Sequence, residues 1–182
     1  VIPTALRLLI FSVLSYGLVY FSYKYFVPMQ GGGGGDFFTY AYMYQNPLVF
    51  SSSQVSSPFV YRQLSAIITH IIYLLAKSGL YLDPPGFGIL FGSQDISQIV
   101  YFAGIVSNYI ALVLCAWGVS LAIDEFDQEL PEIYSLSGGI LCFLSVHSQQ
   151  HILTGLTEGW SWVLIAFGFL FYLRRSRIGL SI

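Results

Sequence analysis

GGGGGDFFTYAYMYQNP fills residues 31–47, and SPFVYRQL follows at residues 57–64 after a serine-rich link. These polar and aromatic pieces interrupt a chain that is otherwise mostly apolar. Asp36 is the only acidic residue before Asp83, and it stands between five glycines and an aromatic segment. The glycine run is typical of a flexible linker. We expect a short helix over 36–45 with Asp36 at its N-cap, where free N–H groups favour a carboxylate.

The composition excludes an ordinary soluble domain. Of the 182 residues, 55% are hydrophobic and 9% are charged, and the mean hydropathy is +0.70. Soluble domains contain about 25% charged residues, so this chain cannot cover a water-facing surface. We therefore expect an integral protein of the plasma or inner membrane. The net charge is −2 and the basic residues cluster only at 174–177, which argues against nucleic-acid binding.

The apolar segments predict an all-α membrane protein with four to five hydrophobic helices in one transmembrane domain over 1–182. Segment 59–82 is ambiguous, because Arg62 and Lys77 enclose only 14 residues. As a helix these cover about 21 Å, whereas the hydrocarbon core is about 30 Å thick. We favour a juxtamembrane or re-entrant helix there over a fifth span. The four predicted spans are 2–27, 99–123, 133–153 and 160–173.

The arginines at 174–177 predict the orientation, because basic residues favour the cytoplasmic side. With four spans both termini are cytoplasmic, and residues 28–98 form a long external loop that carries juxtamembrane helices. Asp36 and Glu158 then share the external face. In the five-span alternative they lie on opposite sides and cannot cooperate.

Several other residues receive structural interpretations. Arg7, near the start of the first span, is expected to snorkel toward water. The acid-rich stretch 124–132 is expected to be a short solvated loop whose charges have no specific role. Cys115 and Cys142 are expected to be small buried hydrophobic residues and not a disulfide or a metal pair. Asn108 is expected to hydrogen-bond a neighbouring helix.

The polar residues of the external face suggest chemistry. Asp36 could act as a general base toward an acceptor hydroxyl, and Arg62 could hold a phosphate by bidentate hydrogen bonds. His147 and His151 are four residues apart and share a helix face, where they could assist a leaving phosphate or serve as structural hydrogen-bonders. No cofactor or metal site is predicted. The glycines lack the Lys-Ser/Thr of a P-loop, and the histidines lack the glutamate of a His-Glu-x-x-His zinc site.

This order of features resembles the N-terminal part of the GT-C superfamily of multispanning membrane glycosyltransferases, which use polyprenyl-phosphate sugars. The resemblance lies in a long apolar helix, then Asp36 followed by Tyr40, then the aromatic-proline segment 57–62 leading into a half-hydrophobic helix. Family members often carry an acidic doublet and have more spans. This chain has neither an acidic doublet beside Asp36 nor as many spans, so we expect it to correspond to an N-terminal portion of such an enzyme or to a degenerate relative.

The resemblance implies inverting transfer of a sugar from a lipid-phosphate donor to an acceptor at the extracytoplasmic face. It implies Asp36 as the catalytic base and Glu158 as a second acidic participant. It also implies a substrate-binding set: Tyr40, Arg62, His147 and His151.

A non-catalytic accessory subunit of a larger membrane complex is the alternative. Small residues in the spans permit close helix packing and support it: Gly104, Ser107, Gly118, Ser120, Gly138 and Gly139. A transporter or channel is less favoured, because the predicted spans contain no intramembrane acid. The expected partners are thus membrane lipids, a polyprenyl-phosphate sugar donor or other membrane subunits.

Overall fold

The computed structural model describes residues 2–25, 34–48, 63–80, 98–144 and 159–180. All regular elements in these ranges are helices, which confirms the all-α prediction. They are α1 Thr4–Tyr25, α2 Gly34–Gln45, α3 Gln63–Leu75, the π-helical turn η2 Ala76–Leu80, α4 Gln98–Phe126, α5 Glu132–Leu144 and α7 Gly159–Leu180.

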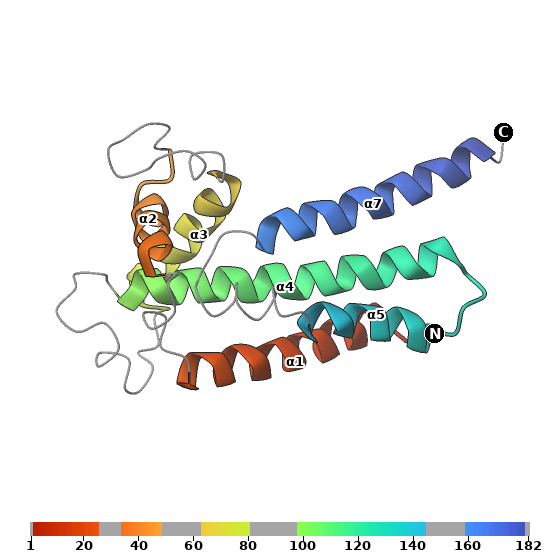
Figure 1. The fold of residues 1–182 in the computed structure, drawn as a ribbon, viewed down its shortest axis with the longest axis horizontal. Helices are drawn as coiled ribbons and strands as arrows, with labels where there is room; N and C mark the ends of the chain where they lie inside the picture. Colours follow the sequence, from red (N-terminus) through yellow and green to blue (C-terminus); the bar gives the residue numbers. More distant parts are fainter. Residues whose placement is uncertain (1, 26–33, 49–62, 81–97, 145–158, 181–182) are drawn as a thin grey trace.

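Helix α4 is the central element of the fold. Helices α1, α5 and α7 pack along it, and α1 also contacts α5 (Figure 1). Helices α4 and α7 run in one direction, while α1 and α5 run in the other. The start of α1 and the end of α7 therefore lie toward the end of the bundle where α4 finishes.

Glycines allow the central helices to approach closely. A Cβ on Gly139 of α5 would lie 2.9 Å from the backbone oxygen of Ala116 in α4 and 2.4 Å from the ring of Phe11 in α1. A Cβ on Gly118 would lie 3.1 Å from Ala166 in α7. A side chain at Gly139 would require the helices to shift, and one at Gly118 would require its neighbours to give by a few tenths of an ångström, so close packing on α4 is favoured by these glycines.

The short helices α2 and α3 pack together at the end of the bundle where α4 begins (Figure 1). Helix α3 continues into η2, in which Gly79 has a φ of +112° that favours glycine. The described residues of predicted segment 59–82 are helical from Gln63 to Leu80. Whether it crosses a membrane stays a prediction.

Two predicted boundaries are wrong. Helix α2 begins at Gly34, so Asp36 lies inside its first turn and not at the N-cap. Helix α4 continues to Phe126, so Asp124 and Glu125 belong to its last turn and not to a loop. In both cases the helix extends past residues that sequence propensity alone assigns to an end or a turn.

Within the described residues, one helix is long and apolar enough to cross a membrane, α4 over Phe102–Phe126. The apolar stretches Thr4–Gly17 and Glu132–Leu144 are shorter. The buried core helix of a soluble protein would meet the same criterion as α4. The four predicted spans and the external loop therefore stay predictions.

Candidate functional site

Three helices meet at the buried hydroxyl of Ser107 in α4. This oxygen accepts a hydrogen bond from the Thr69 hydroxyl of α3 at 2.8 Å and another from the Trp160 indole N–H of α7 at 2.9 Å. A hydroxyl oxygen can accept two hydrogen bonds, so both donors are satisfied. The next residue, Asn108, is also buried, and its side-chain oxygen lies against Gly159 at the start of α7.

His70 joins α3 to α2 beside this junction. Its Nδ1 lies 2.7 Å from the backbone oxygen of Tyr44. Because a carbonyl only accepts, Nδ1 carries the proton in this hydrogen bond. The Tyr73 ring lies beside it, with centroids 6.0 Å apart. His70 was not among the predicted site residues, because no local sequence pattern predicts a contact with a carbonyl 26 residues earlier.

Two tyrosines of α2 fill the space between α2 and the rest of the protein. Tyr40 is fully buried, Tyr44 is nearly so, and their rings stack with centroids 6.4 Å apart. Burial raises the pKa of the Tyr44 phenol well above its ordinary value. The predicted contact of Tyr40 with a substrate stays a prediction, and it would require α2 to move.

The structure describes part of the predicted site. Asp36 lies in the first turn of α2, at the same end of the bundle as the Ser107 junction. Four other predicted residues lie outside the described residues: Arg62, His147, His151 and Glu158. Arg62 directly precedes Gln63, where α3 begins, and Glu158 directly precedes Gly159, where α7 begins.

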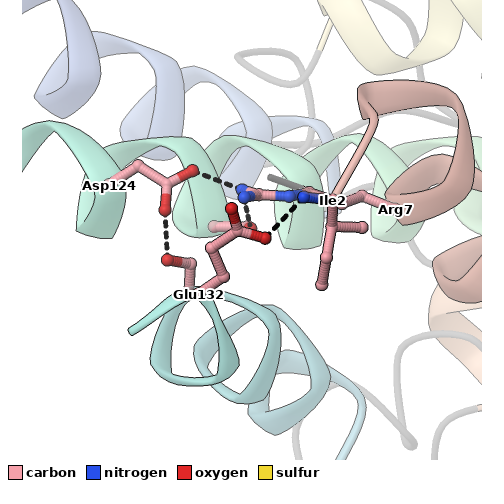
Figure 2. A network of polar contacts seen from close by, with 6 residues as sticks. Ile2, Arg7, Asp124 and Glu132 are labelled. Atoms are coloured by element: carbon pink, nitrogen blue, oxygen red, sulfur yellow. Dashed lines mark hydrogen bonds and ion pairs between the residues drawn. The ribbon is translucent and has the colours of Figure 1, made fainter. Parts of the chain in front are cut away.

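A second polar cluster lies at the opposite end of the bundle (Figure 2). Arg7 of α1 is 5% exposed; its guanidinium forms an ion pair with Asp124 and donates to the Ser120 hydroxyl at 3.2 Å. The Asp124 carboxylate also accepts a hydrogen bond from the Ser135 hydroxyl of α5. Nearby, the backbone N–H of Ile2 donates to the Glu132 carboxylate and lowers its pKa.

This second cluster corrects two predictions. Arg7 does not snorkel to water, because a carboxylate on α4 lies within its reach inside the bundle. The acids of 124–132 are not merely solvated, because Asp124 and Glu132 bind partners in α1 and at the start of the chain. Sequence spacing could not reveal this, since Arg7 and Asp124 are 117 positions apart.

An open apolar pocket of about 380 Å³ lies between α4, α5 and α7. Cys115 and Cys142 both line it and both are free thiols. Among the described residues, no three His, Cys, Asp or Glu side chains gather in a way that could hold a metal ion.

Comparison of the chain with protein-family models, with curated proteins and with solved structures found no match.

Proposed function

We propose that this protein is a membrane-embedded helical bundle that transfers a sugar from a lipid-phosphate donor at the end where α2, α3 and the starts of α4 and α7 meet. The membrane part of the proposal is supported by the distribution of polar and apolar side chains. The transfer chemistry is supported by the residues that this arrangement brings to one end.

Helix α3 is the strongest support for a membrane environment. Its polar residues are buried and its large apolar residues are exposed, which is the reverse of a helix on the surface of a soluble protein. Its buried residues are Ser65, Ala66 and Thr69. Its exposed residues are large and apolar at helical spacing: Leu64, Ile67, Ile71, Leu74 and Leu75. A helix on a soluble protein faces its apolar stripe inward. An outward apolar face with polar residues inside favours a lipid environment.

The other outer helices show the same distribution. Large apolar side chains are exposed on α1, α5 and α7: Leu9, Val13, Tyr16, Ile133, Leu141, Leu144, Leu164, Ile165, Phe169, Phe171 and Tyr172. Soluble monomers rarely expose contiguous apolar patches beyond a few hundred Å². Lipid surrounding the bundle would remove the cost of exposing these side chains to water.

The charges fit a bilayer of ordinary thickness. Asp124 and Glu125 mark one boundary on α4, and Arg174 of α7 binds Glu125 at that level, 3.3 Å away. About 20 helical residues cross the hydrocarbon core, which puts the other boundary near Gly104. The Ser107 junction and the pair α2–α3 then lie close to the external boundary.

The proposed transfer site lies at that boundary. Asp36 takes the proton of the acceptor hydroxyl as the hydroxyl oxygen attacks the anomeric carbon of the sugar. The bond from that carbon to the donor phosphate breaks, and Arg62 and the residues that precede Gly159 hold the departing lipid phosphate. The buried pair Tyr40 and Tyr44, with the His70 bond to the Tyr44 carbonyl, positions the helix that carries Asp36. The observation that supports this assignment is the common end shared by α2, α3 and the start of α7.

The accessory-subunit alternative has lost part of its support. Of the small residues that favoured packing against a partner, Gly118 and Gly139 contact helices of this same chain. Ser107 and Ser120 hydrogen-bond within it. These residues therefore explain how the bundle packs and do not indicate a partner.

The test is a transfer assay on the purified protein with a panel of polyprenyl-phosphate sugars. Asp36→Asn should lower the transfer rate by a factor of about 10² to 10⁴, the usual contribution of a general base. Donor binding should change little. Arg62→Ala should instead weaken donor binding first.

The matched control is Glu129→Gln, which removes one negative charge from an exposed side chain between α4 and α5. It should leave transfer unchanged. Full activity of Asp36→Asn would show that Asp36 is not the catalytic base, because an amide cannot take the proton of the acceptor hydroxyl.

A further inference from the structure

Cys115 of α4 and Cys142 of α5 form a dithiol inside the bundle. Both side chains line the pocket between α4, α5 and α7. Both belong to one apolar cluster, in which Cys115 is buried and Cys142 is partly buried. The two residues are 27 positions apart in sequence, so their proximity results from the packing of α5 on α4.

The packing of α4 on α5 makes this proximity possible. A disulfide needs Cα atoms about 4.4–6.8 Å apart, whereas helix axes usually lie about 8–10 Å apart. Gly139 removes the side chain that would separate the helices, since its Cβ would meet the backbone oxygen of Ala116 at 2.9 Å. Cys115 directly precedes Ala116, and Cys142 lies three residues after Gly139 on nearly the same helix face.

The dithiol also faces an open pocket. This pocket of about 380 Å³ has the two cysteines in its lining, together with the aromatic residues Trp162 and Phe169 of α7. Its other lining residues are Val119, Ile165 and Ala166. The volume is within the range of small-molecule sites, about 300–1,000 Å³. The lining favours a flat apolar ligand that brings no charge.

We propose that Cys115 and Cys142 form a redox dithiol that a lipid-soluble quinone in this pocket oxidises to an interhelical disulfide. One thiol adds to the quinone, and its proton passes to a quinone oxygen. The second sulfur then attacks the first, which forms the S–S bond and breaks the bond between sulfur and ring. The ring keeps that electron pair, takes the second thiol proton and leaves as hydroquinone.

Charge favours this chemistry over metal capture. Two neutral thiols and a neutral quinone become a neutral disulfide and a neutral hydroquinone, so no net charge is left in the apolar pocket. A soft monovalent metal held by two thiolates would leave one negative charge there, and burying an unpaired charge is costly. The proposal depends on the α4–α5–α7 geometry and is independent of sugar transfer at Asp36.

The test treats the purified, reduced protein in lipid nanodiscs with a short-chain benzoquinone. Thiol alkylation and mass spectrometry then count the free thiols. We expect both thiols to disappear together, with loss of two hydrogen atoms and no added quinone. Oxidised glutathione, which is charged, should react at least about tenfold more slowly, because access limits thiol exchange.

Two tryptophan variants test the role of the pocket. Ile165 lines it and is 68% exposed, while Leu164 is 59% exposed and is absent from the lining. Ile165→Trp should slow oxidation by the quinone about tenfold by filling the entrance, and Leu164→Trp should not change the rate. Both changes lie on the outer face of α7, so the fold should persist.

Four results would overturn the proposal. The thiols could stay fully alkylatable after quinone treatment, or end as a stable quinone adduct. Glutathione disulfide could oxidise them as fast as the quinone does. The Ile165→Trp and Leu164→Trp variants could react at equal rates.

Discussion

Arg7 of α1 and Asp124 of α4 form an ion pair inside the end of the bundle where α4 finishes (Figure 2). The same guanidinium donates to Ser120, and the same carboxylate accepts from Ser135 of α5. One charge pair thus connects three helices. Its arginine side chain is 6% exposed and its aspartate side chain 35%, so the cation depends on this partner more than the anion does.

Asp124→Asn should destabilise the protein by about 3 kcal/mol, because it leaves a buried guanidinium without a counter-charge. The amide keeps the shape of the carboxylate and can still accept from Ser135, so the loss reports the charge. Chemical unfolding in detergent measures it. The exposed variant Glu129→Gln should lie within about 0.5 kcal/mol of the unchanged protein.

The double variant Arg7→Met/Asp124→Asn should lose less stability than the sum of the losses of the two single variants. Residues in one ion pair show coupling energies of about 0.5–3 kcal/mol. Strict additivity of the two losses would mean that the ion pair contributes nothing to stability, which would contradict the role of Asp124 as the partner of Arg7.

Glu132 should make stability depend on acid pH. The pKa of Glu132 is lowered from 4.5 in the folded protein, mainly because the Ile2 N–H donates to the carboxylate. A lowered folded pKa contributes stability above pH 4.5 that is lost as the pH falls through the folded value. The difference in stability between the unchanged protein and Glu132→Gln should therefore shrink in acid. Unfolding curves from pH 3 to pH 7 check this, and a difference that is equal at every pH would contradict it.

Gly139→Ala should destabilise the bundle by about 1–3 kcal/mol through overpacking. The added methyl would collide with the ring of Phe11 and with the backbone of α4 at Ala116. Gly17→Ala is the matched control, because nothing lies within 4 Å of the Cβ it would add to α1. That control should be neutral or stabilise by up to about 1 kcal/mol, since alanine favours helix more than glycine. Melting temperatures of the two variants give the comparison.

Ser107→Ala should cost about 1–3 kcal/mol, because it leaves the Trp160 N–H and the Thr69 hydroxyl without their acceptor. Ser78→Ala is the control, as its exposed hydroxyl donates to the Leu75 carbonyl three residues earlier. Thermal unfolding of both variants measures the effect. Equal stability of the two would show that water or another group replaces Ser107.

Impermeant thiol labelling of cells tests the four-span orientation. In a background with Cys115→Ala and Cys142→Ala, a Ser78→Cys variant should react from outside. A Glu129→Cys variant should react only after the membrane is permeabilised. Both positions are exposed, and they lie at opposite ends of the bundle. Labelling of the two variants from the same side would reject the orientation, and with it the external site at Asp36.

The apolar segments alone determined that the protein is all-helical and roughly where its helices lie. Composition and hydropathy suffice to predict the helices, because helix formation in such apolar segments depends on consecutive residues. Helix ends were less predictable. Gly34 lies within α2 and Asp124 within α4, since packing extends a helix beyond the point that local propensity favours.

Only the tertiary structure decided which polar residues meet. Arg7 pairs with Asp124. Thr69 and Trp160 both bind Ser107, and Cys115 and Cys142 line one pocket. The residues of each contact are far apart in sequence, so no local pattern contains it. The physical reason is that an apolar sequence determines which segments form helices. The sizes of individual side chains, down to the missing Cβ of Gly139, determine how those helices pack and which polar groups come within hydrogen-bonding distance.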